Sequence, residues 1–341
     1  MRIFIILNIF FSMIDFSYSQ NNSYIKEIIK YGTYAPSSHN AQMWSVKIID
    51  NQKIKIFPND KRVLPYVDPK NRETWISIGA FVENCVLSAK DMGYNSTVII
   101  NDSDLIIDIT KHKKIKSSTK NINNILKRLT IRTPYLNEKI DDEIINEIID
   151  ISENVFFYQK ETSQGKEIID NSIKAFSLQM QDTNKLKELS EWMTFSYKEE
   201  KERKDGLTPD MLGITGFKHF LFNTFMSKKS VTSKSFIKAS IKGATKQLNS
   251  CSGFIIITSK SNSINELVNA GRTLESVWLK CIENEIAVHP MSQVLEENNY
   301  YELLKKELKI KGEIQMVLRI GKVKHYPERV GRRIDVEKII E

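Results

Sequence analysis

Cysteine is scarce in this sequence of 341 residues, with one each at positions 85, 251 and 281 and no CxxC pair. Such wide spacing argues against a disulfide framework and against a cysteine-rich zinc site. The five histidines are scattered, and the sequence contains no HExxH, GxSxG or GxxxxGK[ST] motif and no GxGxxG after a strand. We therefore predict no metal site and no side chain that acts as a dedicated catalyst.

Charge of one sign is not dominant either. Fifty Lys and Arg residues against 42 Asp and Glu residues leave a net charge of +8, in a chain that is 41% hydrophobic. This composition describes a globular protein with one large domain or two, and excludes a disordered tail, a collagen-like repeat and a polytopic membrane protein. The positive balance permits an anionic ligand but is too mild to indicate nucleic acid.

Long apolar runs are absent after the first residues. Arg2 precedes an apolar run from Ile3 to Ile14, and Ser17-Tyr18-Ser19 follows. This order predicts a signal peptide over residues 1–19 and hence export, to the periplasm if the source is bacterial. The alternative is a buried N-terminal helix in a cytoplasmic protein. No later run is long enough to span a membrane, so no integral span is expected after removal of the signal.

The remaining chain divides into two blocks. Residues 22–125 show a helix at Tyr24–Tyr34, a hairpin of strands at 45–50 and 53–57, and a helix at 73–92 that Gly93 ends. Two short strands near 97–100 and 105–110 follow. Residues 126–341 show helices near 141–151, 162–197 and 264–285, and strands near 155–158, 254–258 and 313–321. Residues 199–250 are predicted to be an irregular, basic, lid-like insertion.

An internal similarity connects the blocks. The motif Gly-x-x-x-Glu opens the body of both long helices, at Gly79–Glu83 and at Gly271–Glu275. Each helix lies between strands in the same order, which favours two related halves within one chain. Two unrelated helices are the alternative.

Two kinds of feature suit an anionic ligand. The segment from Pro36 to Gln42 is dense in side-chain donors and acceptors, although Ser and Asn are also common in capping turns. Two arginine pairs, Arg128 with Arg132 and Arg332 with Arg333, could bind a phosphate in a forked geometry. A solvated basic face is the alternative for both pairs.

The segment Pro36-Ser37-Ser38-His39-Asn40-Ala41-Gln42-Met43-Trp44 resembles the P-S-S-x-N-x-Q-P-W segment of the FMN-dependent nitroreductase family. Further stretches resemble its Acg-like branch, in which two nitroreductase-like halves share one chain. They are Asp68-Pro69 with Arg72-Glu73, Ile78-Gly79-Ala80 with Glu83-Asn84, Asp205-Gly206-Leu207, Gly271-Arg272 through Trp278 to Pro290-Met291-Ser292-Gln293, and Arg332-Arg333. Met43 departs from the family, which has proline there, and this loosens the turn before Trp44.

The resemblance implies FMN as the cofactor. Pro36, Ser37, Ser38 and Asn40 would line the flavin ring, and Pro290, Met291 and Ser292 would face it from the second half. Arg128, Thr130 and Arg132 match the family's R-x-S/T-x-R element, which holds the flavin phosphate, and Arg332 and Arg333 match its terminal basic pair. The sequence supplies one set of these residues, so one flavin per chain is expected.

The resemblance also implies an α+β, three-layer, nitroreductase-like fold with antiparallel-rich mixed sheets, as a family dimer fused into one chain that could stay monomeric. The expected function is that of an FMN oxidoreductase, which passes electrons from a small-molecule donor to a nitro or quinone-type acceptor. The alternative is a protein that binds or sequesters flavin with little turnover. A lid over the ring and export away from NAD(P)H would favour that alternative.

Overall fold

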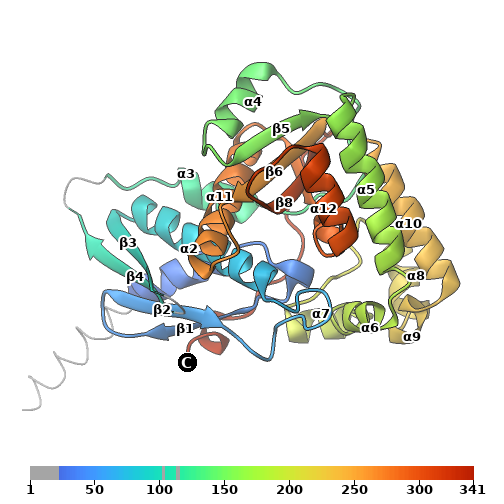
Figure 1. Ribbon diagram of the computed structural model, residues 1–341. Helices are drawn as coiled ribbons and strands as arrows, with labels where there is room; N and C mark the ends of the chain where they lie inside the picture. Colours follow the sequence, from blue (N-terminus) through green and yellow to red (C-terminus); the bar gives the residue numbers. More distant parts are fainter. Residues whose placement is uncertain (1–22, 102–103, 113–115) are drawn as a thin grey trace, which may run out of the picture.

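Figure 1 shows the computed structural model, which describes residues 23–101, 104–112 and 116–341. The predicted signal segment 1–19 lies outside the described residues. Helices surround two sheets of four strands each, and every pairing between named strands is antiparallel. This arrangement confirms the predicted α+β class. Among the described residues, no helix has both the length and the apolar character needed to cross a membrane.

The two sheets share one topology. The first has the order β1-β2-β4-β3 and the second the order β5-β6-β8-β7, so each block supplies one complete sheet. In both, a helix of 20 residues connects the second strand to the third. The elements are β1 (Trp44–Ile48), β2 (Lys53–Pro58), α2 (Arg72–Asp91), β3 (Tyr94–Asn101) and β4 (Asp104–Lys111), and then β5 (Val155–Gln159), β6 (Gly253–Ser259), α11 (Ile264–Glu283), β7 (Ala287–Pro290) and β8 (Glu313–Gly321).

The remaining elements are mostly helices. Residues 23–32 are helical. A 3-10 turn, η1 (Ser38–Asn40), lies near the start of the segment Pro36–Trp44, which is called the signature segment below. The others are α3 (Lys120–Lys127), α4 (Asp142–Ile149), α5 (Ser163–Gln179), α6 (Thr183–Glu191), α7 (Tyr197–Arg203), α8 (Phe217–Phe225), α9 (Lys228–Val231), α10 (Lys234–Leu248), η2 (Ser292–Val294), α12 (Asn298–Glu307) and η3 (Val336–Lys338).

The prediction that residues 199–250 are irregular is wrong, because α7 to α10 occupy most of this segment. Serine side chains cap these helices. Ser196 accepts a hydrogen bond from the backbone of Glu199 at 3.2 Å, and Ser233 accepts one from Phe236 at 3.3 Å. Ser and Thr compete with the backbone inside helices but stabilise their N-termini. A serine-rich chain can therefore form several short helices without a strong apolar period.

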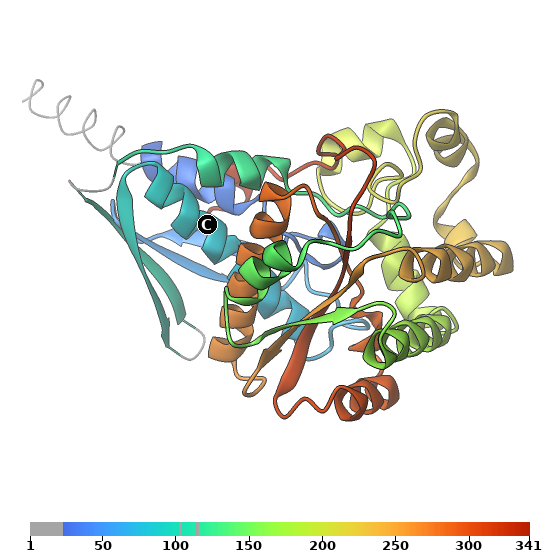
Figure 2. The same cartoon turned by 90° about the horizontal axis from the view of Figure 1, so that it is seen from above.

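The helices α2 and α11 cross at the centre of the molecule, between the two sheets (Figures 1 and 2). Gly79 of α2 meets Gly271 of α11 at the crossing. A Cβ atom on Gly79 would lie 2.1 Å from the carbonyl oxygen of Val268, and one on Gly271 would lie 2.0 Å from that of Ile76. The repeated glycine of the sequence is thus the residue that lets the two backbones touch.

The C-terminal tail returns from the second half to the first. After β8 the chain runs across the molecule, and its end pairs with the edge strand β1. The backbone N–H of Val46 donates to Ile339 at 2.8 Å, and that of Glu341 donates to Val46 at 2.9 Å. The tail therefore fastens the two halves together and carries its arginines along their junction.

The glycine crossing leads to a stability prediction. We expect Gly79→Ala to lower the free energy of unfolding by about 1–3 kcal/mol, since the added methyl forces the helices apart. Gly243→Ala in α10 is the matched control, because a Cβ atom there meets nothing within 4 Å. That change should raise stability by about 1 kcal/mol through helix propensity alone. Urea unfolding checks both, and equal effects of the two changes would contradict the close crossing.

Candidate functional site

A cavity of about 830 Å³ lies where the two halves meet. This volume is within the usual range for sites that bind a cofactor or small molecule. All the site residues predicted from sequence line it except Arg332, namely Pro36, Ser37, Ser38, Asn40, Arg128, Thr130, Arg132, Pro290, Met291, Ser292 and Arg333. Arg332 is exposed. Arg329, which sequence reasoning did not select, lines the cavity in its stead.

The signature segment holds a strained backbone. His39, Asn40 and Gln42 have positive φ angles of 54°, 53° and 54°. Few residues other than glycine adopt this region, and such strain persists only where the surroundings enforce it. Here the backbone N–H of Gln42 donates to Ser37 Oγ at 3.0 Å, and Ser38 Oγ donates to Glu73. The segment is thus fixed from within and by the first turn of α2.

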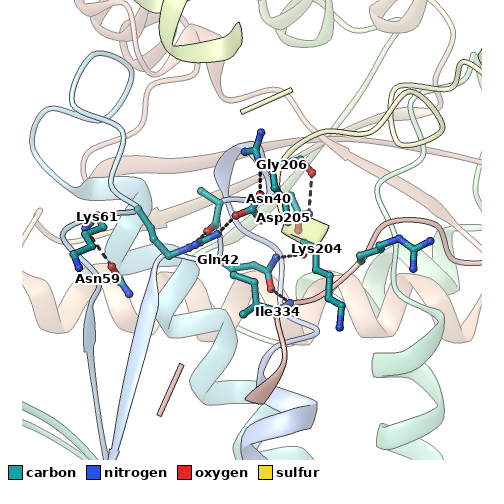
Figure 3. Close-up of polar contacts among 12 residues, drawn as sticks. Asn40, Gln42, Asn59, Lys61, Lys204, Asp205, Gly206 and Ile334 are labelled. Atoms are coloured by element: carbon teal, nitrogen blue, oxygen red, sulfur yellow. Dashed lines mark hydrogen bonds and ion pairs between the residues drawn. The ribbon is translucent and has the colours of Figure 1, made fainter. Parts of the chain in front are cut away.

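Asn40 and Gln42 join three distant parts of the chain, as Figure 3 shows. Asn40 Nδ2 donates to the carbonyl oxygen of Gly206 at 2.9 Å, and its Oδ1 accepts from Arg333 at 2.6 Å. Gln42 Nε2 donates to Lys204 O at 2.9 Å, and its Oε1 accepts from the backbone of Ile334 at 2.9 Å. Both side chains are buried. Their amides are therefore satisfied within the protein and position the loop and the tail around the cavity.

Three arginines gather at the wall that the tail completes. Arg128 and Arg333 both donate to the carbonyl oxygen of Tyr34, at 2.8 and 3.4 Å, and the Arg329 guanidinium lies 4.5 Å from the ring centre of Tyr34. Arg128 also lies over the Trp278 ring at 4.8 Å. Stacking and carbonyl contacts hold the guanidinium planes but do not neutralise their charge.

One carboxyl group, that of Glu275, faces these cations. It lies 3.6 Å from Arg128 Nε, and burial raises its pKa to about 7 although Arg128 opposes this. Burial and the neighbouring Arg128 lower the pKa of Arg329 to about 10, and burial with Arg329 and Arg128 lowers that of Arg333 strongly. Arg329 Nη2 and Arg333 Nε are buried without a partner. The cluster thus has positive charge and donor groups available for an anion.

Arg132 faces another part of the wall. Its Nη1 donates to Met211 O at 2.7 Å. Burial lowers the pKa of Arg132 to about 10. Tyr135 opposes this shift and Arg319 adds to it. Burial, with Arg319 and Arg132 adding to it, also lowers the pKa of His289 well below its usual range. The nearby His289 is therefore neutral. Arg128 and Arg132 both line the cavity, and their partners within the protein differ.

Two carboxyl groups also line the cavity. Glu73 forms an ion pair with Arg72 at 2.8 Å, and Glu296 accepts a hydrogen bond from Gln179. Burial, with the charge of Glu73 adding to it, raises the pKa of Glu296 to about 8. This raised pKa favours the protonated form of Glu296. Nothing in the sequence marked Glu296, since its role depends on the tertiary contacts.

The other wall of the cavity is mostly apolar, although Gln179, Lys185, Gln247 and several serines also belong to it. The helices α5, α6, α8 and α10 and the loop before α8 line it, including the segment that the sequence predicts to be a lid. Its methionine and phenylalanine side chains are Phe176, Met180, Met193, Met211, Phe222, Met226 and Phe236. Thioethers and aromatic rings fit flat apolar molecules of varied outline. Across the described ranges, His, Cys, Asp and Glu nowhere gather in a group that could hold a metal ion.

No family model matches the chain, and no curated protein matches it. Among solved structures, the chain is similar to a nitroreductase-like family protein from Bacillus cereus, with 13% identity and a TM-score of 0.37, over 67% of this chain and 97% of that one. It is also similar to the FMN-dependent nitroreductase NfnB from Mycobacterium smegmatis in complex with NADPH, with 10% identity and a TM-score of 0.35, over 62% and 95%.

The contacts of Asn40 lead to a second prediction. Asn40→Ala leaves the Gly206 carbonyl and Arg333 without their partner, so we expect the free energy of unfolding to fall by about 1–3 kcal/mol. Asn146→Ala, at an exposed position of α4, is the control and should change stability little. Chemical denaturation of both variants without added ligand gives the comparison. Equal stabilities would show that Asn40 does not join the segments.

The pKa of Glu296 leads to a third prediction. The folded state keeps a proton there, between pH 4.5 and about 8, that the unfolded state releases. The contribution of Glu296 to the free energy of unfolding therefore falls as pH rises through this window. Glu296→Gln should remove that part of the pH dependence, with a higher urea midpoint than the wild type at pH 8 and a smaller difference at pH 5. Glu307→Gln, exposed on α12, should leave the dependence unchanged.

Proposed function

We propose that the cavity binds one FMN and that the protein is an oxidoreductase of the nitroreductase type, which passes electrons from a small-molecule donor to a nitro or quinone-type acceptor. The observation that carries this proposal is the cluster of Arg128, Arg329 and Arg333. These cations line a cavity of cofactor size, and two of them have buried donor groups without a partner. A phosphate supplies the negative charge and the acceptors that they lack.

The other lining residues fit the ring of a flavin. A flat ring needs apolar contacts on its faces and hydrogen-bonding groups at its edge, and Ile76, Leu274 and Met291 line the cavity together with polar side chains. His289 Nδ1 and Gln293 Oε1 are buried there without a partner. We assign the edge of the ring to Ser37, Ser38, Thr130 and Ser292. Asn40, which the sequence assigns to the ring, instead positions the phosphate-binding Arg333, because its amide is already bonded to Gly206 and Arg333.

When bound, FMN would supply the redox chemistry. The protein's own residues would bind and orient the flavin and would supply protons. Reduction of a nitro group or a quinone consumes protons as well as electrons, and protonated Glu296 holds one at the cavity wall. The apolar wall of α5, α6, α8 and α10 excludes water from the acceptor. These roles favour a flat, apolar acceptor.

We also propose that the chain is a fused pair of nitroreductase-like halves of the Acg-like kind, divided near residue 125. The shared strand order, the equal central helices and the matching Gly79 and Gly271 support a duplication. A single chain then supplies both sides of the site, as a dimer would. We propose one flavin and a monomer. Export through residues 1–19 stays a prediction from sequence.

A flavin-sequestering protein is the second candidate. The bonds from Asn40 and Gln42 to residues 204–206 hold the insertion against the cavity, which would restrict a donor's approach. Anaerobic mixing of the FMN-loaded protein with NADH and NADPH distinguishes the two candidates. Rapid bleaching of the flavin absorbance supports the enzyme. A band that only dithionite bleaches supports sequestration.

The arginine cluster leads to a fourth prediction. Arg329→Gln should weaken FMN binding about 10- to 100-fold, the range expected for lost hydrogen bonds to a charged group. Riboflavin, which lacks the phosphate, should bind as before. Arg332→Gln is the matched control, because Arg332 belongs to the same tail but is exposed. Quenching of flavin fluorescence measures all four affinities. Equal losses for FMN and riboflavin would contradict a phosphate site at Arg329.

A further inference from the structure

The segment that carries α8, α9 and α10 is strongly basic. Residues 211–250 contain seven lysines and no Asp or Glu, and so account for nearly all of the net charge of +8. All seven lysines are exposed. They are Lys218, Lys228, Lys229, Lys234, Lys238, Lys242 and Lys246. In Figures 1 and 2 these helices lie together at one side of the molecule, far from β3 and β4.

The same segment exposes large aromatic side chains. On α8, Phe217, Phe220 and Phe225 are 73%, 53% and 75% exposed, and Leu221 is 36% exposed. Their spacing of three, four and eight residues places them along one side of the helix. Phe222 is buried and lines the cavity. Helix α8 thus has one apolar face toward the cavity and a second toward solvent.

We propose that the α8–α10 surface docks this protein on an anionic lipid bilayer. Exposed aromatic residues among lysines are the composition of helices that lie in the membrane interface. The rings would enter the boundary between headgroups and acyl chains, and the lysines would meet anionic headgroups. The docked chain lies on the bilayer and does not span it.

Charge complementarity is what selects this occupant. A second copy of the chain would bring seven further lysines against the same surface, so self-association there is opposed by repulsion. Lys228 forms an ion pair with Glu191, and an anionic bilayer attracts the other six. Docking would also place the apolar wall of the cavity beside the membrane, since Phe222 and the exposed rings share one helix. Access for acceptors dissolved in the bilayer is a consequence that rests on the proposed function, whereas docking itself does not.

A single fluorescent label tests the docking surface. The three native cysteines are buried, so a cysteine introduced by Thr224→Cys on α8 can be labelled selectively with a polarity-sensitive dye. Vesicles of phosphatidylcholine with phosphatidylglycerol should shift its emission to the blue, and vesicles of phosphatidylcholine alone should not. Salt should weaken the response. A label at Asn146→Cys on α4 is the control. It lies outside the proposed docking surface and should not respond.

Paired variants complete the test. Phe217→Ser with Phe225→Ser should weaken binding to anionic vesicles at least about tenfold, because two rings lose their apolar contacts. Phe156→Ser on β5, where the side chain is 40% exposed, should not weaken it. Lys234→Ala with Lys238→Ala should also weaken binding, unlike Lys139→Ala with Lys311→Ala. No blue shift at position 224, an equal shift at position 146, or a response to single-stranded RNA but not to vesicles would overturn the proposal. The FMN affinity of the same variants is measured separately, so that failure of the docking proposal can be distinguished from failure of the proposed function.

Discussion

The contact between Gly79 and Gly271 is the constraint on which the rest of the structure depends. It lets α2 and α11 pack backbone against backbone, and each helix carries one sheet. A single methyl group at either position would overlap a carbonyl oxygen of the other helix. The distance between the two halves is therefore set at one point near the centre. The cavity extends along their junction, with Ile76 of α2 and Leu274 of α11 in its wall.

Because the halves are held at one separation, residues far apart in sequence meet with little freedom. The tail can bring Arg333 to Asn40 only if the first and second sheets keep their mutual position. Gln42 then bonds both the tail and residue 204. These bonds are buried or partly buried, so an unpaired group there would cost free energy. The junction is thus both a structural fastening and the frame of the site.

Much of the fold follows from local pattern. The hairpin of β1 and β2, the helices α2 and α11 and the strands β6 and β8 are near their predicted positions. Each is an apolar-rich run, and β6 and β8 are buried almost throughout. The cavity also brings together most of the residues that the motifs marked. Tertiary contacts decide the rest. The motif marks Arg332, but Arg329 is the residue that lines the cavity. The motif also does not reveal that the Asn40 side chain is bonded within the protein.

The positively charged residues of this chain form two physically different groups. Arginines dominate at the junction, where stacking on Tyr34 and Trp278 and bonds to carbonyl groups can hold a planar cation that is partly desolvated. Lysines dominate on α8–α10, where an ammonium group stays hydrated. Arg128 is buried and Arg329 and Arg333 are partly buried, so desolvation of these charges costs free energy that a bound anion would offset. The surface lysines incur no such cost. A net charge of +8 therefore describes neither group, and only their placement separates the proposed anion site from the proposed docking face.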